Sequence, residues 1–364
     1  MSERPAAPQK QASHTLLSIQ ILRGVAALGV LTHHTFVETT IRLGGEAVWN
    51  NAVVGAAGVD LFFVISGFVM VYASEPLFGR PHAARIFILR RLARIVPLYW
   101  AVTGVILGYI VVRYGGLLMD LYPPATIVTS LLFYPYPRPD GVIAPIHGLG
   151  WTLNYEMFFY AVFAAAILLA RRAAIIAISA AFIALVTIRQ LYALPLPFSF
   201  WFDPIILEFC LGMLIADAYG RGVRLPRKLS WWLALAALTA FAASAAFGPN
   251  VPWRVLEWGV PSAALVAALV LSRETAQPSP IGRAARLLGD ASYSLYLVHP
   301  LVMMIARQTI LRWMDFTAFP WVLGLMIFFG SIAAAIASYL LFEKPIMRAL
   351  GRRINRKSAR SLEG

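Results

Sequence analysis

Long apolar stretches separated by short polar segments dominate this sequence. A membrane-spanning helix needs about 20 apolar residues, and a stretch well below that length cannot cross a bilayer. The segment Thr126–Phe133 is therefore interpreted as a re-entrant or interfacial piece. The pattern predicts an all-α integral membrane protein with about ten transmembrane helices. The ten apolar stretches are Leu16–Val37, Val54–Ser74, Ile95–Val112, Gly150–Ala170, Ala173–Ile188, Asp203–Tyr219, Trp231–Phe247, Leu256–Ser272, Ala291–Leu311 and Phe319–Phe342.

The composition and the distribution of charge agree with a membrane protein. Hydrophobic residues make up 60% of the chain and charged residues 13%, and the mean hydropathy is +0.72, which excludes an ordinary soluble domain. If the N-terminus is cytoplasmic, most of the 31 Lys and Arg residues fall in cytoplasmic segments. Both termini are then cytoplasmic, and the net charge of +14 reflects anchoring next to anionic lipid rather than nucleic-acid binding.

This topology divides the chain into three parts. Residues 1–15 form a polar cytoplasmic tail with no cleavable signal, residues 16–342 form the transmembrane domain, and residues 343–364 form a basic cytoplasmic tail. Cys210 is the single cysteine, so we expect neither a disulfide framework nor a cysteine-based metal site.

Two polar residues in the first apolar stretch indicate function. A charged residue at the centre of a membrane helix costs roughly 2.5–3.5 kcal/mol on insertion scales, so Arg23 is a functional candidate. His34 follows eleven residues later, and at about 100° per residue both side chains lie on nearly one helix face, about 16 Å apart along the axis. The alternative is that the pair forms a polar clamp between helices.

Three carboxylates are expected at a depth similar to that of His34, near the outer surface. Asp60 and Glu156 lie in stretches that run inward from the outside, and Glu208 enters from the outside in the same way. A carboxylate beside a histidine fixes its tautomer and stabilises its charged form, which suits a general base. The sequence therefore predicts one outward-facing layer of these four groups, although Asp60 and Glu208 equally suit hydrogen bonding near the interface.

A basic group is expected at the cytoplasmic surface. Arg91 and Arg94 lie on adjacent turns of a helix that enters the membrane, and Arg23 lies at a similar depth. Guanidinium groups in this arrangement suit phosphate recognition, although Arg91 and Arg94 alone also suit a role in membrane topology. His299 is expected in the inner half of its span, where the following proline favours a structural kink over catalysis.

Six ordered motifs resemble acyltransferase family 3, the integral-membrane O-acyltransferases of bacteria, over nearly the whole of that domain. The detailed sequences of these motifs are most similar to those of the exopolysaccharide O-acetyltransferase subgroup. The motifs are LRGVAALGVLTHH with Arg23 and His34, GVDLFFVISGFVM with Asp60, Ser66 and Gly67, RRLARIVPLYW with Arg91, Arg94, Pro97 and Tyr99, GWTLNYEMFFY with Trp151, Glu156 and Tyr160, EFCLGMLIA around Glu208, and YSLYLVHPLV around His299.

The resemblance implies transfer of an acyl group from acyl-CoA, with acetyl-CoA as the expected donor, to a carbohydrate hydroxyl, without a metal. Arg91, Arg94 and Arg23 would bind the CoA phosphates, and Ser66 with Gly67 would allow close approach of the donor. His34 would act as general base or carry the acyl group, and Glu156 with Asp60 would orient it.

The same resemblance places the protein in the bacterial cytoplasmic (inner) membrane. Its expected partners are a glycan or lipid-linked sugar acceptor, the lipid bilayer, and polysaccharide-assembly proteins or a second copy of the chain. The alternative function is a transporter or flippase for a lipid-linked sugar, because intramembrane ionisable groups also form substrate pathways. The acceptor, the acyl group and the side of the membrane on which transfer finishes stay open.

Overall fold

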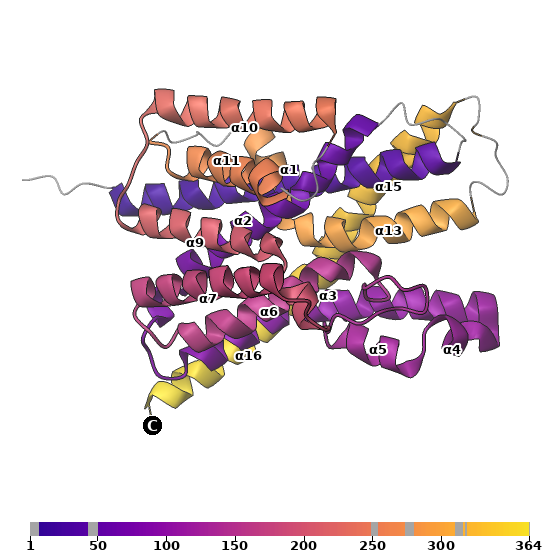
Figure 1. Ribbon diagram of the computed structural model, residues 1–364, viewed down its shortest axis with the longest axis horizontal. Helices are drawn as coiled ribbons and strands as arrows, with labels where there is room; N and C mark the ends of the chain where they lie inside the picture. Colours follow the sequence, from indigo (N-terminus) through magenta and orange to yellow (C-terminus); the bar gives the residue numbers. More distant parts are fainter. Residues whose placement is uncertain are drawn as a thin grey trace, which may run out of the picture.

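A computed structural model describes residues 7–42, 50–248, 254–273, 280–309, 316 and 319–363. Helices account for nearly all of these residues, and no β-strand occurs among them. The longer helices lie roughly side by side as a bundle (Figure 1). They are α1 (Ala7–Arg42), α2 (Gly58–Ser74), α3 (Ala83–Tyr114), α6 (Trp151–Ala166), α7 (Arg171–Leu191), α9 (Leu207–Gly220), α10 (Arg227–Phe247), α11 (Val260–Val270), α13 (Ser292–Gln308), α15 (Pro320–Ser338) and α16 (Lys344–Glu363).

Shorter elements connect these helices. The 3₁₀ turn Asn50–Ala57 leads into α2, and π-helical turns occupy Val255–Gly259 before α11 and Tyr339–Glu343 between α15 and α16. The remaining helices are α4 (Leu118–Leu121), α5 (Pro124–Leu131), α8 (Phe198–Trp201) and α12 (Pro280–Asp290). At 1.5 Å per residue α5 is only about 12 Å long, consistent with the short segment expected there.

Each of the ten apolar stretches overlaps a helix, and five helical segments of the described part of the chain are long and apolar enough to span a membrane. The all-α class is therefore confirmed, whereas the count of ten spans and the cytoplasmic placement of the termini stay predictions. The first helix, which contains Arg23 and His34, is not among the five. The five are Val54–Leu77, Ala83–Tyr114, Arg171–Leu191, Arg227–Phe247 and Trp321–Ile354.

Helix α2 is buried against α9 through two glycines. A Cβ at Gly67 would overlap the carbonyl oxygen of Phe209, and a Cβ at Gly212 would overlap that of Val64. Small residues allow backbones of membrane helices to approach closely in this way. The contact fixes the position of α2, and with it the side chains that α2 directs toward α3, α6 and α11.

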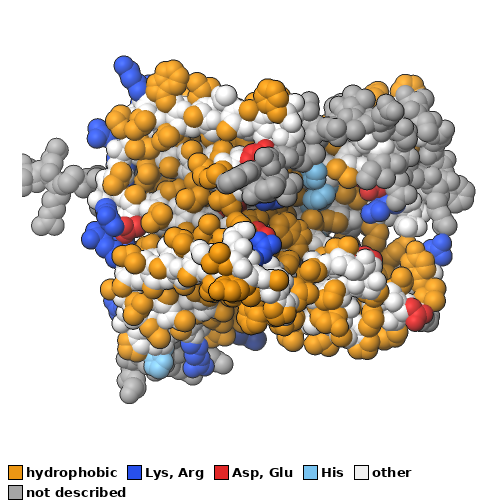
Figure 2. All heavy atoms as spheres, in the orientation of Figure 1, with side chains coloured by type: hydrophobic (Ala, Val, Ile, Leu, Met, Phe, Trp, Pro, Cys, Tyr) orange, Lys and Arg blue, Asp and Glu red, His pale blue; other side chains and the backbone are white. Residues whose placement is uncertain are grey.

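Basic residues gather at one end of the bundle. Most of the Lys and Arg atoms visible in Figure 2 lie at the left-hand end, where Figure 1 also places the C-terminus, and hydrophobic side chains cover most of the rest of this face. At this end Arg171 joins two helices, because it pairs with Glu75 at 3.0 Å and with Asp217 at 2.9 Å.

Candidate active site

A cavity at the centre of the bundle contains three arginines. Arg23 comes from α1, and Arg91 and Arg94 from adjacent turns of α3. The cavity encloses about 740 Å³, part of it open to solvent, and α2, α6 and α13 complete its wall. The Nε atom of Arg91 is buried and has no hydrogen-bond partner in the described part of the chain. A buried guanidinium donor without an acceptor leaves this cavity suited to an anionic ligand.

Glu156 lies in the same cavity, on the second turn of α6. Its Oε2 atom accepts a hydrogen bond from Tyr160 Oη at 3.2 Å, and Arg94 and Arg91 act on its charge. Ser66 of α2 also lines the cavity and contacts the Glu156 carboxyl group. The carboxylate therefore offsets part of the arginine charge, and it is fixed by neighbouring hydroxyl groups.

A second carboxylate near the arginines was not anticipated from the sequence. Glu343 is the last residue of the π-helical turn that follows α15, and its Oε2 atom accepts a hydrogen bond from Ser294 Oγ at 2.6 Å. Its charge acts on Arg23 and Arg94. A π-helical turn frequently marks a functional site. A single acidic residue that ends an apolar stretch, as in LLFEKP, is the sequence signal that could have identified it.

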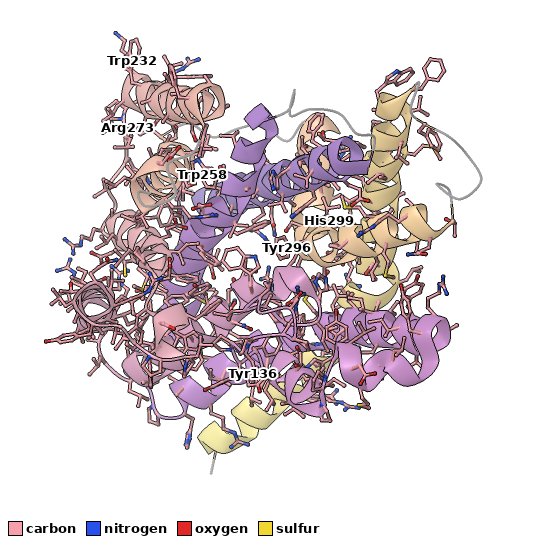
Figure 3. The ribbon with its side chains drawn as sticks, turned by 45° about the vertical axis from the view of Figure 1, so that its right-hand side comes forward. Tyr136, Trp232, Trp258, Arg273, Tyr296 and His299 are labelled. Carbon is pink, nitrogen blue, oxygen red and sulfur yellow. The ribbon has the colours of Figure 1, made fainter. Side chains whose placement is uncertain are left out.

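His34 on α1 lies beside His299 on α13, and it has no contact with a carboxylate among the described residues. Nδ1 of His34 and Nε2 of His299 are 3.1 Å apart, and the ring centroids are 5.1 Å apart at an interplanar angle of 29°. His299 is buried, whereas His34 is half-buried. Figure 3 shows His299 and Tyr296 near the middle of the bundle, whereas Trp232 lies at its edge.

Two aromatic rings lie between the cavity and the histidines. Phe62 and Tyr296 both line the cavity, and their centroids are 6.0 Å apart in an edge-to-face arrangement. The Tyr296 ring is 6.5 Å from that of His299, and its hydroxyl group is held by Thr152 Oγ1 at 3.0 Å and by the Leu149 carbonyl at 3.1 Å. Tyr296 thus adjoins both the arginine cavity and His299, although neither His34 nor His299 lines the cavity.

Asp60 and Glu208 form a separate charged group with Arg254. Asp60 accepts two hydrogen bonds from Arg254, from Nε at 2.9 Å and from Nη2 at 2.7 Å. The guanidinium group of Arg254 also lies over the Trp258 ring, 4.7 Å from its centroid. Both carboxylates are fully buried, and Glu208 lies next to Asp60 and against Gly259.

The structure therefore does not reproduce the predicted layer of four groups. His34 pairs with His299, Asp60 and Glu208 meet Arg254, and Glu156 joins the arginines. Depth along a helix axis does not determine which way a side chain faces, and this is the reason for the difference. His299, expected in the inner half of its span, is instead brought to His34.

The position of Gly67 also differs from the expectation that it contributes to the donor site. It faces the α9 backbone rather than the cavity, whereas its neighbour Ser66 lines the cavity. The spacing of Arg23 and His34 holds: both lie on one continuous helix, with Arg23 in the cavity and His34 beside α13.

Comparison with known proteins assigns the chain to a family. The acyltransferase domain model of family 3 matches residues 16–342. The chain belongs to acyltransferase family 3. As a member of this family it is an acyltransferase, and its apolar helices indicate a multi-pass membrane protein. The matched domain contains the site residues predicted from the sequence, among them Arg23, His34, Asp60, Arg91, Arg94 and Glu156.

Two relatives align with this acyltransferase over nearly their full lengths. The exopolysaccharide production protein ExoZ of Rhizobium meliloti (strain 1021) is 34% identical over 83% of this chain and 93% of its own length. The acyltransferase MdmB of Streptomyces mycarofaciens is 28% identical over 93% of both chains. No solved structure matches this family member.

Proposed function

We propose that this protein transfers an acyl group, acetyl in the first instance, from cytoplasmic acyl-CoA to a hydroxyl group of a cell-surface carbohydrate. The observation that carries the proposal is the cavity with Arg23, Arg91 and Arg94, in which Arg91 Nε has no acceptor among the described residues. Phosphate groups are the acidic part of acyl-CoA, and arginine binds phosphate in a bidentate manner. The similarity to the exopolysaccharide production protein ExoZ supports an exopolysaccharide as the acceptor.

The positions of the arginines and of His34 support separate roles, namely donor binding by the arginines and proton transfer by His34. The arginine end would hold the phosphate groups of the donor, and the pantetheine arm would extend past Phe62 and Tyr296 toward His34. His34 would accept the proton of the acceptor hydroxyl group while the hydroxyl oxygen attacks the thioester carbonyl carbon. The carbon–sulfur bond then breaks, and the CoA thiolate takes the proton from His34. No proton is gained or lost overall.

The positive-inside rule puts the basic end of the bundle in the cytoplasm of a bacterial inner membrane, and acyl-CoA would enter the central cavity from that side. The carboxylates of Glu156 and Glu343 would offset the mutual repulsion of the arginines before the donor binds. Membership of an acyltransferase family favours this function over a transporter or flippase, which has no use for a site selective for CoA phosphates.

The test is acetyl-CoA binding to the purified full-length protein in detergent, measured by calorimetry. We expect the Arg91→Ala/Arg94→Ala double variant to bind at least about tenfold more weakly, because each lost charged hydrogen bond is worth roughly 1.5–3 kcal/mol. The matched control is Arg85→Ala/Arg90→Ala, which removes two exposed arginines of the same helix that do not line the cavity.

Three outcomes are informative. Binding lost in the cavity variant and kept in the control supports the donor site. Equal losses in both variants would make the arginines topology determinants. No binding by folded wild-type protein would refute the donor assignment and favour a lipid-linked sugar as ligand. His34→Ala, measured alongside, should bind acetyl-CoA as the wild type does but fail to release free CoA.

A further inference from the structure

The histidine pair has a feature that the proposed function leaves open, namely which nitrogen of each ring carries the hydrogen. His299 Nδ1 is 2.8 Å from the carbonyl oxygen of Leu295, one helical turn earlier. The Tyr296 carbonyl also contacts the His299 ring, and this carbonyl has lost its helical donor because Pro300 has no N–H. A carbonyl oxygen only accepts hydrogen bonds, so His299 Nδ1 must carry a hydrogen.

The hydrogen on Nδ1 determines the rest of the pair. In a neutral imidazole only one nitrogen carries hydrogen, so Nε2 of His299 is an acceptor. The nitrogen that it meets, Nδ1 of His34 at 3.1 Å, must therefore donate. The His34 ring also hydrogen-bonds the Val30 carbonyl one helical turn earlier, and a neutral ring has only one N–H, so His34 Nδ1–H serves both acceptors. Nε2 of His34 then keeps its lone pair, which is the form that a general base requires.

We infer that His299 is a positioning residue, which together with the Val30 carbonyl holds His34 as the Nδ1–H tautomer and so makes His34 Nε2 the reactive nitrogen. This inference rests on the proposed function for its catalytic consequence but not for the tautomer itself. In many enzymes a carboxylate orients the catalytic histidine. Here a second histidine, itself fixed by a backbone carbonyl, takes that place.

The surroundings of the pair support a neutral acceptor at this position. The titratable groups that face His34 are His33 and His299, and those that face His299 are His34 and His147. Neither His34 nor His299 has an ion pair with a carboxylate in the described ranges. A carboxylate partner would hold His34 charged, whereas a neutral imidazole selects the tautomer without adding charge.

An ion pair joins the two helices that carry the histidines, and a second contact anchors α13 to a loop. Glu38, one turn beyond His34 on α1, pairs with Arg307 on α13 at 3.3 Å. His147 binds the Leu297 carbonyl through Nε2 at 2.9 Å, next to the proline of α13. His147, which gave no clear signal in the sequence, is thus a buried contact between the loop before α6 and the helix that presents His299.

Two substitutions separate acceptor geometry from proton transfer. The amide oxygen of Gln reaches the position of histidine Nε2 and accepts a hydrogen bond, but Gln does not transfer protons. Phe has a similar size and offers no acceptor. We therefore expect His299→Gln to keep CoA release within about tenfold of the wild type. His299→Phe should lower kcat about 100-fold, within the range of a lost general base, and leave acetyl-CoA affinity unchanged.

The tautomer is measured without turnover by ¹⁵N NMR of histidine-labelled protein in detergent, with the His34 signal assigned from a His34→Gln variant. We expect a protonated Nδ1 and an unprotonated Nε2 on His34 in the wild type and in His299→Gln, and a mixture of tautomers in His299→Phe. The rate of CoA release as a function of pH, and calorimetric acetyl-CoA affinity, are measured on the same samples.

Each result bears on one statement. A wild-type His34 that carries hydrogen on Nε2, or a His299→Phe variant that works normally, overturns the inference. Equal loss in the Gln and Phe variants also overturns it, because His299 would then transfer protons itself. If wild-type protein neither binds acetyl-CoA nor releases CoA, the proposed function fails while the NMR result still decides the tautomer.

Discussion

The two groups of buried charge in this bundle differ in how their arginines are satisfied. Arg254 donates two hydrogen bonds to Asp60, from Nε and Nη2, and its guanidinium group lies over the Trp258 ring. Glu156 lines the central cavity with three arginines, Glu343 acts on two of them from outside the cavity wall, and Arg91 Nε has no acceptor among the described residues. A bidentate pair resembles a structural clamp, whereas spare donors around a cavity resemble a binding site.

The comparison shows that membership in a family motif does not by itself define a role. Asp60 and Ser66 belong to the same motif on α2, yet Asp60 binds Arg254 and Ser66 lines the arginine cavity. Asp60 was expected to orient His34, and its observed partner supports a different role. The first three predictions below test whether the clamp and the close helix contacts act on stability while the cavity acts on ligand binding.

Removal of one partner from the clamp should have the largest effect on stability. Asp60→Ala leaves the Arg254 charge in a largely buried position, and breaking a buried pair costs about 3–5 kcal/mol. We expect a marked fall in the apparent unfolding midpoint in detergent, followed by tryptophan fluorescence. The double variant Asp60→Ala/Arg254→Ala should recover part of the loss, because no unpaired charge remains.

The contrasting result would change the interpretation of this clamp. If Asp60→Ala unfolds at the wild-type temperature and binds acetyl-CoA normally but releases no CoA, Asp60 acts in catalysis. Arg91→Met is the corresponding variant in the arginine cavity. It should leave the unfolding midpoint nearly unchanged, because the cation that it removes lacks a full set of acceptors. It should also weaken acetyl-CoA binding.

Much of the fold could be predicted from the sequence, because an apolar stretch is itself the physical requirement for a buried membrane helix. The same holds for Arg23 and His34, since one helix fixes their relation. Pairs between distant helices leave no such trace. Asp60 and Arg254 are 194 residues apart, and His34 and His299 are 265 apart. Neither separation follows from helical periodicity, so the sequence alone does not reveal which of these residues pair.

Glu156 shows why the depth argument failed in part. Helix α6 starts at Trp151, after a 3₁₀ turn, so Glu156 lies near its beginning, as expected. The face of α6 toward α3 and α13 then directs Glu156 to the arginines, together with Tyr160 one turn later. Helix rotation depends on packing by neighbouring helices, which the sequence of α6 alone does not specify.

The contact between α2 and α9 predicts a second, smaller effect. Gly67→Ala places a methyl group against the Phe209 carbonyl, and overpacking of this kind costs about 1–3 kcal/mol. Gly104→Ala on α3 is the matched control, because a Cβ there meets no atom within 4 Å. We expect the first variant to unfold at a lower temperature and the second to match the wild type. Equal behaviour of the two would show that α2 and α9 separate without cost.

The smallest effect is expected at the end of the bundle, where one arginine pairs with two acids of different exposure. Arg171 contacts Glu75, whose side chain is 57% exposed, and Asp217, which is 9% exposed. An exposed ion pair contributes less than about 1 kcal/mol, so Glu75→Gln should barely change the unfolding midpoint, and the change should disappear in high salt.

Asp217→Asn should cost more and keep its effect in high salt, because the buried carboxylate also pairs with Arg221. Both variants keep the size and hydrogen-bonding atoms of the side chain, so the difference between them measures charge in two environments. A larger effect for Glu75 than for Asp217 would mean that burial does not rank the charges of this protein. The distinction drawn between the Asp60 clamp and the arginine cavity would then lose its physical basis.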